Sequence, residues 1–132
     1  MDKGEFLNMN KVINSEKAPA AIGPYSQAIE SNGFVYVSGQ LPINVETGTM
    51  PETIEEQTAQ SLNNIKSILE AAGTSMDNVV KTTVLMTNLG DFTKMNEVYG
   101  TFFSGAYPAR AAYQVVALPK GAMVEIEAVA SK

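Results

Sequence analysis

Hydrophobic and polar residues along the chain predict short strands interrupted by two helices. Two runs, 27–31 and 34–38, flank Asn32-Gly33. An Asn-Gly pair in this position is the strongest short-range signal for a β-hairpin, because both central turn residues need a positive φ. The stretch FVYVSG, 34–39, is rich in β-branched and aromatic residues, as a buried strand should be. We therefore expect a hairpin in the first third of the chain.

A helix is predicted after the hairpin. Thr53, with Glu56 three residues later, forms a capping-box pattern, and Gly73 stands where a helix commonly ends. The residues between them place one apolar face toward a core: Ile54, Leu62, Ile65, Ile68, Leu69 and Ala72.

The second half of the chain predicts a strand, a helix and two more strands. Residues 78–89 have strand composition, and Asp91 is a candidate cap for a second helix. That helix has one apolar side, made by Phe92, Met95, Val98, Tyr99 and Phe102. Residues 110–117 and 123–130 form the last strands, with LPKGA as the turn between them.

This order, β-β-α-β-α-β-β, predicts a two-layer α+β domain with five or six strands and both helices on one face of the sheet. In the last strand Val124, Ile126 and Ala128 point one way. The other side mixes apolar and acidic residues, namely Met123, Glu125, Glu127 and Val129. That second face is either a subunit interface or a partly exposed surface.

Composition limits the class of protein. The length of 132 residues fits one domain, which we place at residues 9–132. Residues 1–8 are expected to be a disordered tail or a vector-derived leftover. The net charge of −5 and the scattered lysines argue against nucleic acid as a partner. No apolar run is long enough to span a membrane.

The chain contains neither cysteine nor histidine. Thiol nucleophiles, histidine bases and zinc fingers are therefore excluded, and no calcium-loop spacing or phosphate-loop motif occurs. The absence of disulfides fits a reducing compartment, and we expect the cytoplasm. Any acid–base chemistry must use carboxylates, tyrosine, lysine or water.

Arg110 is the only arginine in the chain and follows Pro108 in an apolar stretch. Its guanidinium matches a carboxylate in a bidentate fashion, which lysine cannot do. It is either a receptor for a ligand carboxylate or one half of a structural ion pair with Glu125 or Glu127 on a neighbouring strand.

Other residues could complete a site. Glu125 and Glu127 could position or deprotonate a water, or could be solvated charges at a sheet end. Tyr25 follows a loop stiffened by Pro and Gly, and it could donate to a substrate or pack in the core. The backbone of Ser38 and Gly39 could face a ligand or form a turn.

At these residues the chain resembles the Rid family of reactive intermediate deaminases, also called the YjgF/UK114-like family. Six motifs occur in family order over residues 11–130: APAAIGPYSQAI, VSGQLP, VKTTV, NEVYGTFF, YPARAAYQV and LPKGAMVEIEAVA. One departure is Ala112, where many bacterial members carry cysteine.

The resemblance implies a chorismate-mutase-like (YjgF-like) fold and a homotrimer with sites between subunits. The implied activity is the hydrolysis of 2-imino acids, such as 2-iminobutanoate and 2-iminopropanoate, to 2-oxo acids and ammonia. This activity implies no cofactor and no metal. Arg110 matches the carboxylate-binding arginine and Glu125 the water-holding glutamate. Tyr25 and Asn96 match further site positions, and the resemblance places the backbone of Ser38 and Gly39 beside the substrate. Ala112 occupies a further substrate-binding position with a residue type that departs from many members. Glu127 matches no catalytic position.

Two other functions stay open at this point. The same Arg110 pocket could serve a non-catalytic trimer that binds 2-oxo acids and regulates a partner. An endoribonuclease, a label also attached to this family, has little support in a chain without histidine or a basic patch.

Overall fold

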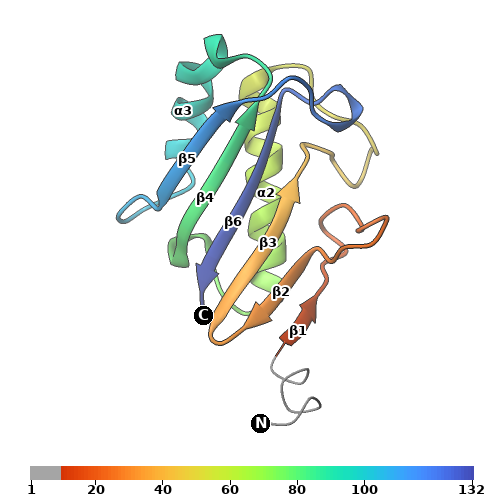
Figure 1. Ribbon diagram of the computed structural model, residues 1–132, viewed down its shortest axis with the longest axis vertical. Helices are drawn as coiled ribbons and strands as arrows, with labels where there is room; N and C mark the ends of the chain where they lie inside the picture. The colour runs from red at the N-terminus through yellow and green to blue at the C-terminus, as the bar shows by residue number, and fades with distance from the viewer. Residues whose placement is uncertain (1–9) are drawn as a thin grey trace.

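The computed structural model describes residues 10–132, which form a six-stranded sheet with two helices on one face (Figure 1). The expectation for residues 1–8 lies outside this range. The strands and helices are β1 (Asn10–Ile13), β2 (Ala28–Ser31), β3 (Phe34–Gln40), α2 (Ile54–Ala71), β4 (Val79–Met86), α3 (Phe92–Gly100), β5 (Ala109–Gln114) and β6 (Val124–Ser131). Short 3₁₀ turns, Met76–Asn78, Leu89–Asp91 and Pro119–Gly121, join some of them.

The strand order in the sheet is β1-β2-β3-β6-β4-β5. Only β4 and β5 are parallel, and α3 makes the crossover between them; the other neighbours are antiparallel. A parallel pair needs such a crossover, whereas antiparallel strands can be joined by a tight turn. The predicted α+β class, with a mixed sheet and two helices, is confirmed.

The predicted local signals for the hairpin and for α2 are also confirmed. Asn32 and Gly33 have φ values of 51° and 81° and join β2 to β3. At the start of α2, the Thr53 hydroxyl accepts the backbone N–H of Glu56 at 3.1 Å. After its end, Gly73 has a φ of 83°, the left-handed conformation that glycine adopts without strain.

Several predicted boundaries were wrong. The strand β1 was not predicted at all; β4 ends at Met86 rather than at residue 89, and β5 ends at Gln114 rather than at residue 117. Asp91 is the residue before α3, but its side chain makes no capping bond. Instead, the Asn88 side chain accepts the N–H of Gly90 at 2.8 Å and caps the preceding 3₁₀ turn.

The alternation predicted for β6 is confirmed, and it separates a core face from an open face. Val124, Ile126 and Ala128 are buried, as are the apolar residues predicted on α2. On the opposite side a cross-strand row of apolar residues runs through four strands: Val12, Ile29, Tyr36 and Val129. Val12 and Tyr36 are 55% and 49% exposed, so this face of the sheet carries uncovered apolar surface.

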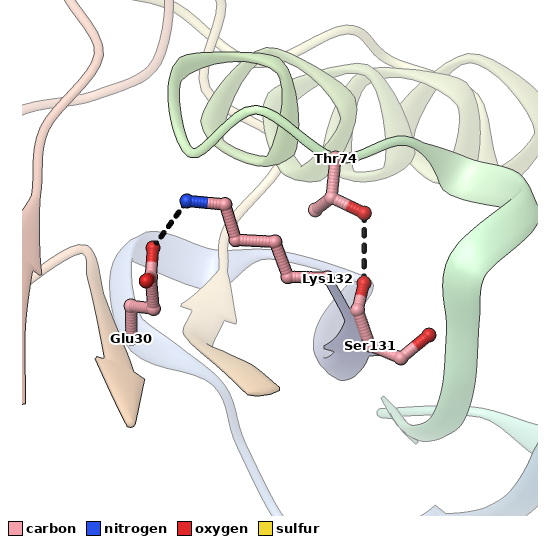
Figure 2. Close-up of polar contacts among 4 residues, drawn as sticks. All are labelled: Glu30, Thr74, Ser131 and Lys132. Atoms are coloured by element: carbon pink, nitrogen blue, oxygen red, sulfur yellow. Dashed lines mark hydrogen bonds and ion pairs between the residues drawn. The ribbon is translucent and has the colours of Figure 1, made fainter. Parts of the chain in front are cut away.

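The end of β6 connects three parts of the fold (Figure 2). The Thr74 hydroxyl, after α2, donates to the Ser131 carbonyl at 2.8 Å. Lys132 forms an ion pair with Glu30 of β2 at 2.9 Å. The backbone N–H of Lys132 also donates to the carbonyl of Gly33 at 2.9 Å. The loop after α2 and the β2–β3 turn are thereby tied to the last strand.

Candidate functional site

Arg110 lies on β5 and is held by α3. Its register partner on β4 is Thr82, which is buried under the helices, so Arg110 points to the helix side of the sheet. The Arg110 Nη1 donates to the Asn96 side-chain oxygen at 2.7 Å. The guanidinium carbon also lies 4.9 Å from the ring centre of Tyr99 and 5.3 Å from that of Phe92. The guanidinium is therefore oriented by an amide oxygen and two ring faces.

A cavity of about 480 Å³ opens beside this guanidinium. It is lined by Asn96, Tyr99, Gly100, Tyr107, Pro108 and Arg110. The volume is within the range of pockets for small molecules. Within residues 10–132 the one ion pair is that of Lys132 with Glu30, so no described carboxylate neutralises Arg110. The remaining N–H donors of the guanidinium are available to a ligand.

Glu125 lies on the opposite, open face of the sheet. Its partner on β4 is Leu85, and its carboxylate covers Gly39, where β3 bulges between Val37 and Gln40. A Cβ at position 39 would lie 2.7 Å from Glu125 Oε1. Burial, and secondarily the nearby charge of Glu127, raise the pKa of the Glu125 carboxyl above its ordinary value.

Tyr25 and Ser38 lie in the segments next to Gly39 and Glu125. Tyr25 is 54% exposed, in the loop that enters β2. Its backbone N–H donates to the carbonyl of Gly23 at 2.9 Å, which makes a tight turn. The Ser38 hydroxyl donates to the carbonyl of Ser26 at 2.6 Å, which anchors the residue next to Tyr25 on the β3 bulge.

The predicted site residues therefore fall into two groups. Arg110 and Asn96 form one, and Ala112, half-buried on the same side of β5, lies beside them. Glu125 and Gly39 form the other, with Ser38 and the Tyr25 loop next to them. The groups lie on opposite sides of the sheet, so one chain does not unite them.

The alternative of an ion pair between Arg110 and Glu125 or Glu127 is wrong for this chain. It assumed that the strand of Arg110 pairs with the last strand, whereas β4 lies between β5 and β6. Both glutamates also point to the open face. The sequence suggested that β5 and β6, which follow one another, are antiparallel neighbours. Instead, the α3 crossover places β5 beside β4.

Sequence reasoning missed the contribution of Phe92 and Tyr99, which it assigned only to the apolar side of the second helix. With Asn96 they form the spacing 92, 96, 99, which places them on one stripe of a helix. That spacing was visible in the sequence, but it also fits ordinary core packing, and Tyr99 is indeed buried. The missing information was which strand lies beneath the stripe.

Residues 10–132 contain no group of three or more acidic, histidine or cysteine residues placed to hold a metal ion. In the same part of the chain, no helix is both long and apolar enough to cross a membrane.

Comparison with known proteins adds a second line of argument. Residues 15–132 match the model of the family described as Endoribonuclease L-PSP. A mouse (Mus musculus) protein named 2-iminobutanoate/2-iminopropanoate deaminase is 52% identical over 123 residues, which are 92% of this chain and 91% of that protein.

Two solved structures have the same fold. One is E. coli TdcF with bound serine, at a TM-score of 0.90 and 42% identity, over 92% of this chain and 98% of that one. The other is YyfA from Yersinia pestis, described as a member of the conserved Rid protein family. Its TM-score is 0.90 and its sequence identity is 50%, over 93% of this chain and 99% of that one. The chain thus belongs to the Endoribonuclease L-PSP family, the group of the Rid and YjgF proteins that its motifs resemble.

Proposed function

We propose that this protein is a deaminase that hydrolyses reactive 2-imino acids to 2-oxo acids and ammonia, without a cofactor. The observation that carries the proposal is the unneutralised Arg110 guanidinium, oriented beside a cavity. A 2-imino acid has a carboxylate next to its C=N group, and Arg110 would bind that carboxylate and fix the reacting carbon. The deaminase name of the mouse relative, and the serine bound in TdcF, support a small α-substituted carboxylate as the ligand.

The complete site requires a second copy of the chain. Arg110 and Glu125 lie on opposite sides of one sheet, so the Arg110 edge of one subunit must meet the open face of the next. The apolar row on that face supports such contact. A closed ring of identical contacts gives each interface the same site, and we propose a homotrimer.

In the proposed reaction, a water held by the Glu125 carboxylate adds to the C=N carbon. One water proton passes to Glu125 and the imine nitrogen takes up a proton from solvent, which gives a carbinolamine. Glu125 then gives its proton to the amino nitrogen, and the carbinolamine hydroxyl releases its proton to solvent. The C–N bond breaks, which releases ammonia and the 2-oxo acid and returns Glu125 to its ionised form. Tyr25 would hydrogen-bond the nitrogen or close the pocket.

A coupled assay tests this proposal. Threonine dehydratase generates 2-iminobutanoate while semicarbazide traps it, and the protein is added as wild type or as Arg110→Ala. We expect only the wild type to divert imine from the trap. Because Arg110 is exposed on an edge strand, the variant should keep its fold. Circular dichroism checks the fold of the variant, and gel filtration checks its assembly. Retained activity in a folded Arg110→Ala variant contradicts the proposal.

A 2-oxo-acid sensor would use the same pocket, and Glu125→Gln separates it from an enzyme. For an enzyme we expect this variant to bind 2-oxobutanoate about as well as the wild type in calorimetry, while turnover disappears. If the wild type binds 2-oxobutanoate but turns over no imine, the sensor function replaces the deaminase.

The family description names an endoribonuclease, but the chain has no histidine and a net charge of −5. Metal-free cleavage of RNA by the purified protein, lost in Arg110→Ala, would support that activity instead. The absence of cysteine is compatible with the cytoplasm, which we include in the proposal.

A further inference from the structure

Tyr99 occupies an unusual position beneath the Arg110 guanidinium. The side chain is 5% exposed, and its hydroxyl shares a hydrogen bond of 2.7 Å with the buried hydroxyl of Thr82. Thr82 is the β4 residue in register with Arg110. Tyr99 therefore extends from α3, and its hydroxyl is hydrogen-bonded to β4, the strand next to the one that carries Arg110.

The Arg110 guanidinium makes two kinds of contact, one hydrogen bond through an N–H group and two contacts with aromatic rings. Asn96 takes one N–H at 2.7 Å, and the rings of Tyr99 and Phe92 lie 4.9 and 5.3 Å from its central carbon. Both distances are within the range of cation–π attraction, about 6 Å. A ring face uses none of the N–H donors, so it restrains the guanidinium without competing with a carboxylate.

The environment of the phenol fits this arrangement. Burial raises the pKa of Tyr99, although the hydrogen bond with Thr82 and the charge of Arg110 oppose that rise. The hydroxyl therefore stays protonated at neutral pH, and the ring presents a neutral π face to the cation.

We infer that Tyr99 is a positioning residue: its ring face, fixed by Thr82, holds the Arg110 guanidinium in the orientation that receives the substrate carboxylate. This inference rests on the proposed function, in which Arg110 binds that carboxylate. Tyr99 itself does not contact the reacting atoms; it acts through Arg110.

Kinetics on three variants test the inference. Tyr99→Leu removes the ring face, and we expect KM for the imine and Kd for 2-oxobutanoate to rise about fivefold or more, with kcat within about twofold. Tyr99→Phe keeps the face and loses only the hydroxyl bond, so its KM should stay within about threefold of the wild type although its melting temperature falls.

Phe103→Leu is the matched control. Phe103 is also buried, and its ring centre lies 5.0 Å from that of Tyr99, but it makes no cation–π contact with Arg110. We expect this variant to melt at a lower temperature with an unchanged KM. An equal rise of KM in Phe103→Leu would assign the effect to general loss of packing and overturn the inference.

A direct readout is available because Arg110 is the only arginine. Its Nε–H group gives one side-chain signal in a ¹⁵N NMR spectrum, which needs no further assignment. We expect Tyr99→Leu to remove the Tyr99 contribution to the ring-current shift of that signal, while the contribution of Phe92 remains, and Phe103→Leu to leave the signal in place. An unmoved signal in Tyr99→Leu overturns the inference.

Different results would contradict the proposed function and the positioning role of Tyr99. A wild type that neither binds 2-oxobutanoate nor turns over imine contradicts the proposed function. A wild type that does both, with an unchanged KM in Tyr99→Leu, contradicts only the positioning role of Tyr99.

Discussion

Glu125 is a carboxylate whose charge is costly where it lies. Half-buried between Gly39 and Leu85, it loses part of the hydration that stabilises its ionised form, and Glu127 adds a repulsive charge. Both effects raise its pKa, so it takes up a proton at a higher pH than an ordinary glutamate does. If Glu125 is a base that must be ionised to hold a water, activity on the acidic side is lost at a higher pH than an ordinary glutamate would give.

We predict that Glu127→Gln shifts this acidic loss of activity to lower pH. The variant removes the repulsion but not the burial, so the pKa of Glu125 should fall part of the way toward its ordinary value. The measurement is the pH dependence of kcat/KM for imine hydrolysis. Glu70→Gln, an exposed position on α2, changes the net charge equally and should leave the profile in place. A profile that Glu127→Gln does not move would exclude Glu125 as the titrating base.

At this scale the sequence was most informative where a residue type was rare. Arg110 could be singled out because it is the only guanidinium, and Gly39 and Glu125 because they stand in motifs of a family. Phe92 and Tyr99 could not be separated from core residues, because a helical stripe has the same spacing whether it packs on aliphatic side chains or on a guanidinium.

At the scale of elements, buried amides hold two loops of the chain, one of which carries Tyr25. Gln27, at the entry to β2, accepts the N–H of Ser15 at 2.7 Å and donates to the carbonyls of Ser15, Ala18 and Pro19 at 2.8–3.3 Å. Asn64 on α2 donates to the carbonyls of Leu41 and Ile43 in the same way. These loops have few apolar anchors, so hydrogen bonds to the core fix their paths.

We expect Gln27→Leu to release the segment that carries Tyr25. The substitution keeps a buried side chain of similar size but leaves backbone groups of Ser15, Ala18 and Pro19 without partners. Imine turnover should fall by about tenfold or more, and the melting temperature should fall as well.

Gln57→Leu is the control for this prediction. Gln57 is buried and bonded to the Pro51 carbonyl and the Met123 N–H, away from the Tyr25 loop. It should lower the melting temperature with a much smaller effect on turnover. Equal losses of turnover in both variants would refute a specific role for Gln27 in placing the loop.

The elements themselves followed from local signals, whereas their ends and pairing did not. Asn32-Gly33 and the Thr53 cap act within a few residues, so the sequence displays them directly. The end of β4 at Met86 depends on an Asn88 turn, and β1 exists only because β2 offers it a partner. Pairing is a long-range property that periodicity along the chain does not contain.

At the scale of the whole molecule, the separation of Arg110 from Glu125 predicts that each active site takes its residues from two subunits. Arg110→Ala and Glu125→Gln subunits should each be inactive alone. Unfolded together in equal amounts and refolded, they should regain activity, because some interfaces then join an intact Arg110 of one variant to an intact Glu125 of the other. Random assembly would restore about a quarter of the sites.

The measurement is the imine assay on the mixture before and after joint refolding, with each variant refolded alone as the control. If the mixture stays inactive although gel filtration and mass spectrometry show mixed assemblies, the site does not draw its two groups from different chains.

The central place of β6 has a consequence for the synthesis of the protein. Among the strands of residues 10–132, β1, β2 and β3 form one half of the sheet and β4 and β5 the other, and only β6 is hydrogen-bonded to both halves. A nascent chain that has not reached Val124 therefore carries β3 and β4 with unpaired inner edges. Such edges are where growing chains pair wrongly with one another. Folding of this protein must therefore wait for nearly the whole described chain to leave the ribosome, and these two edges are what a chaperone would have to shield until then.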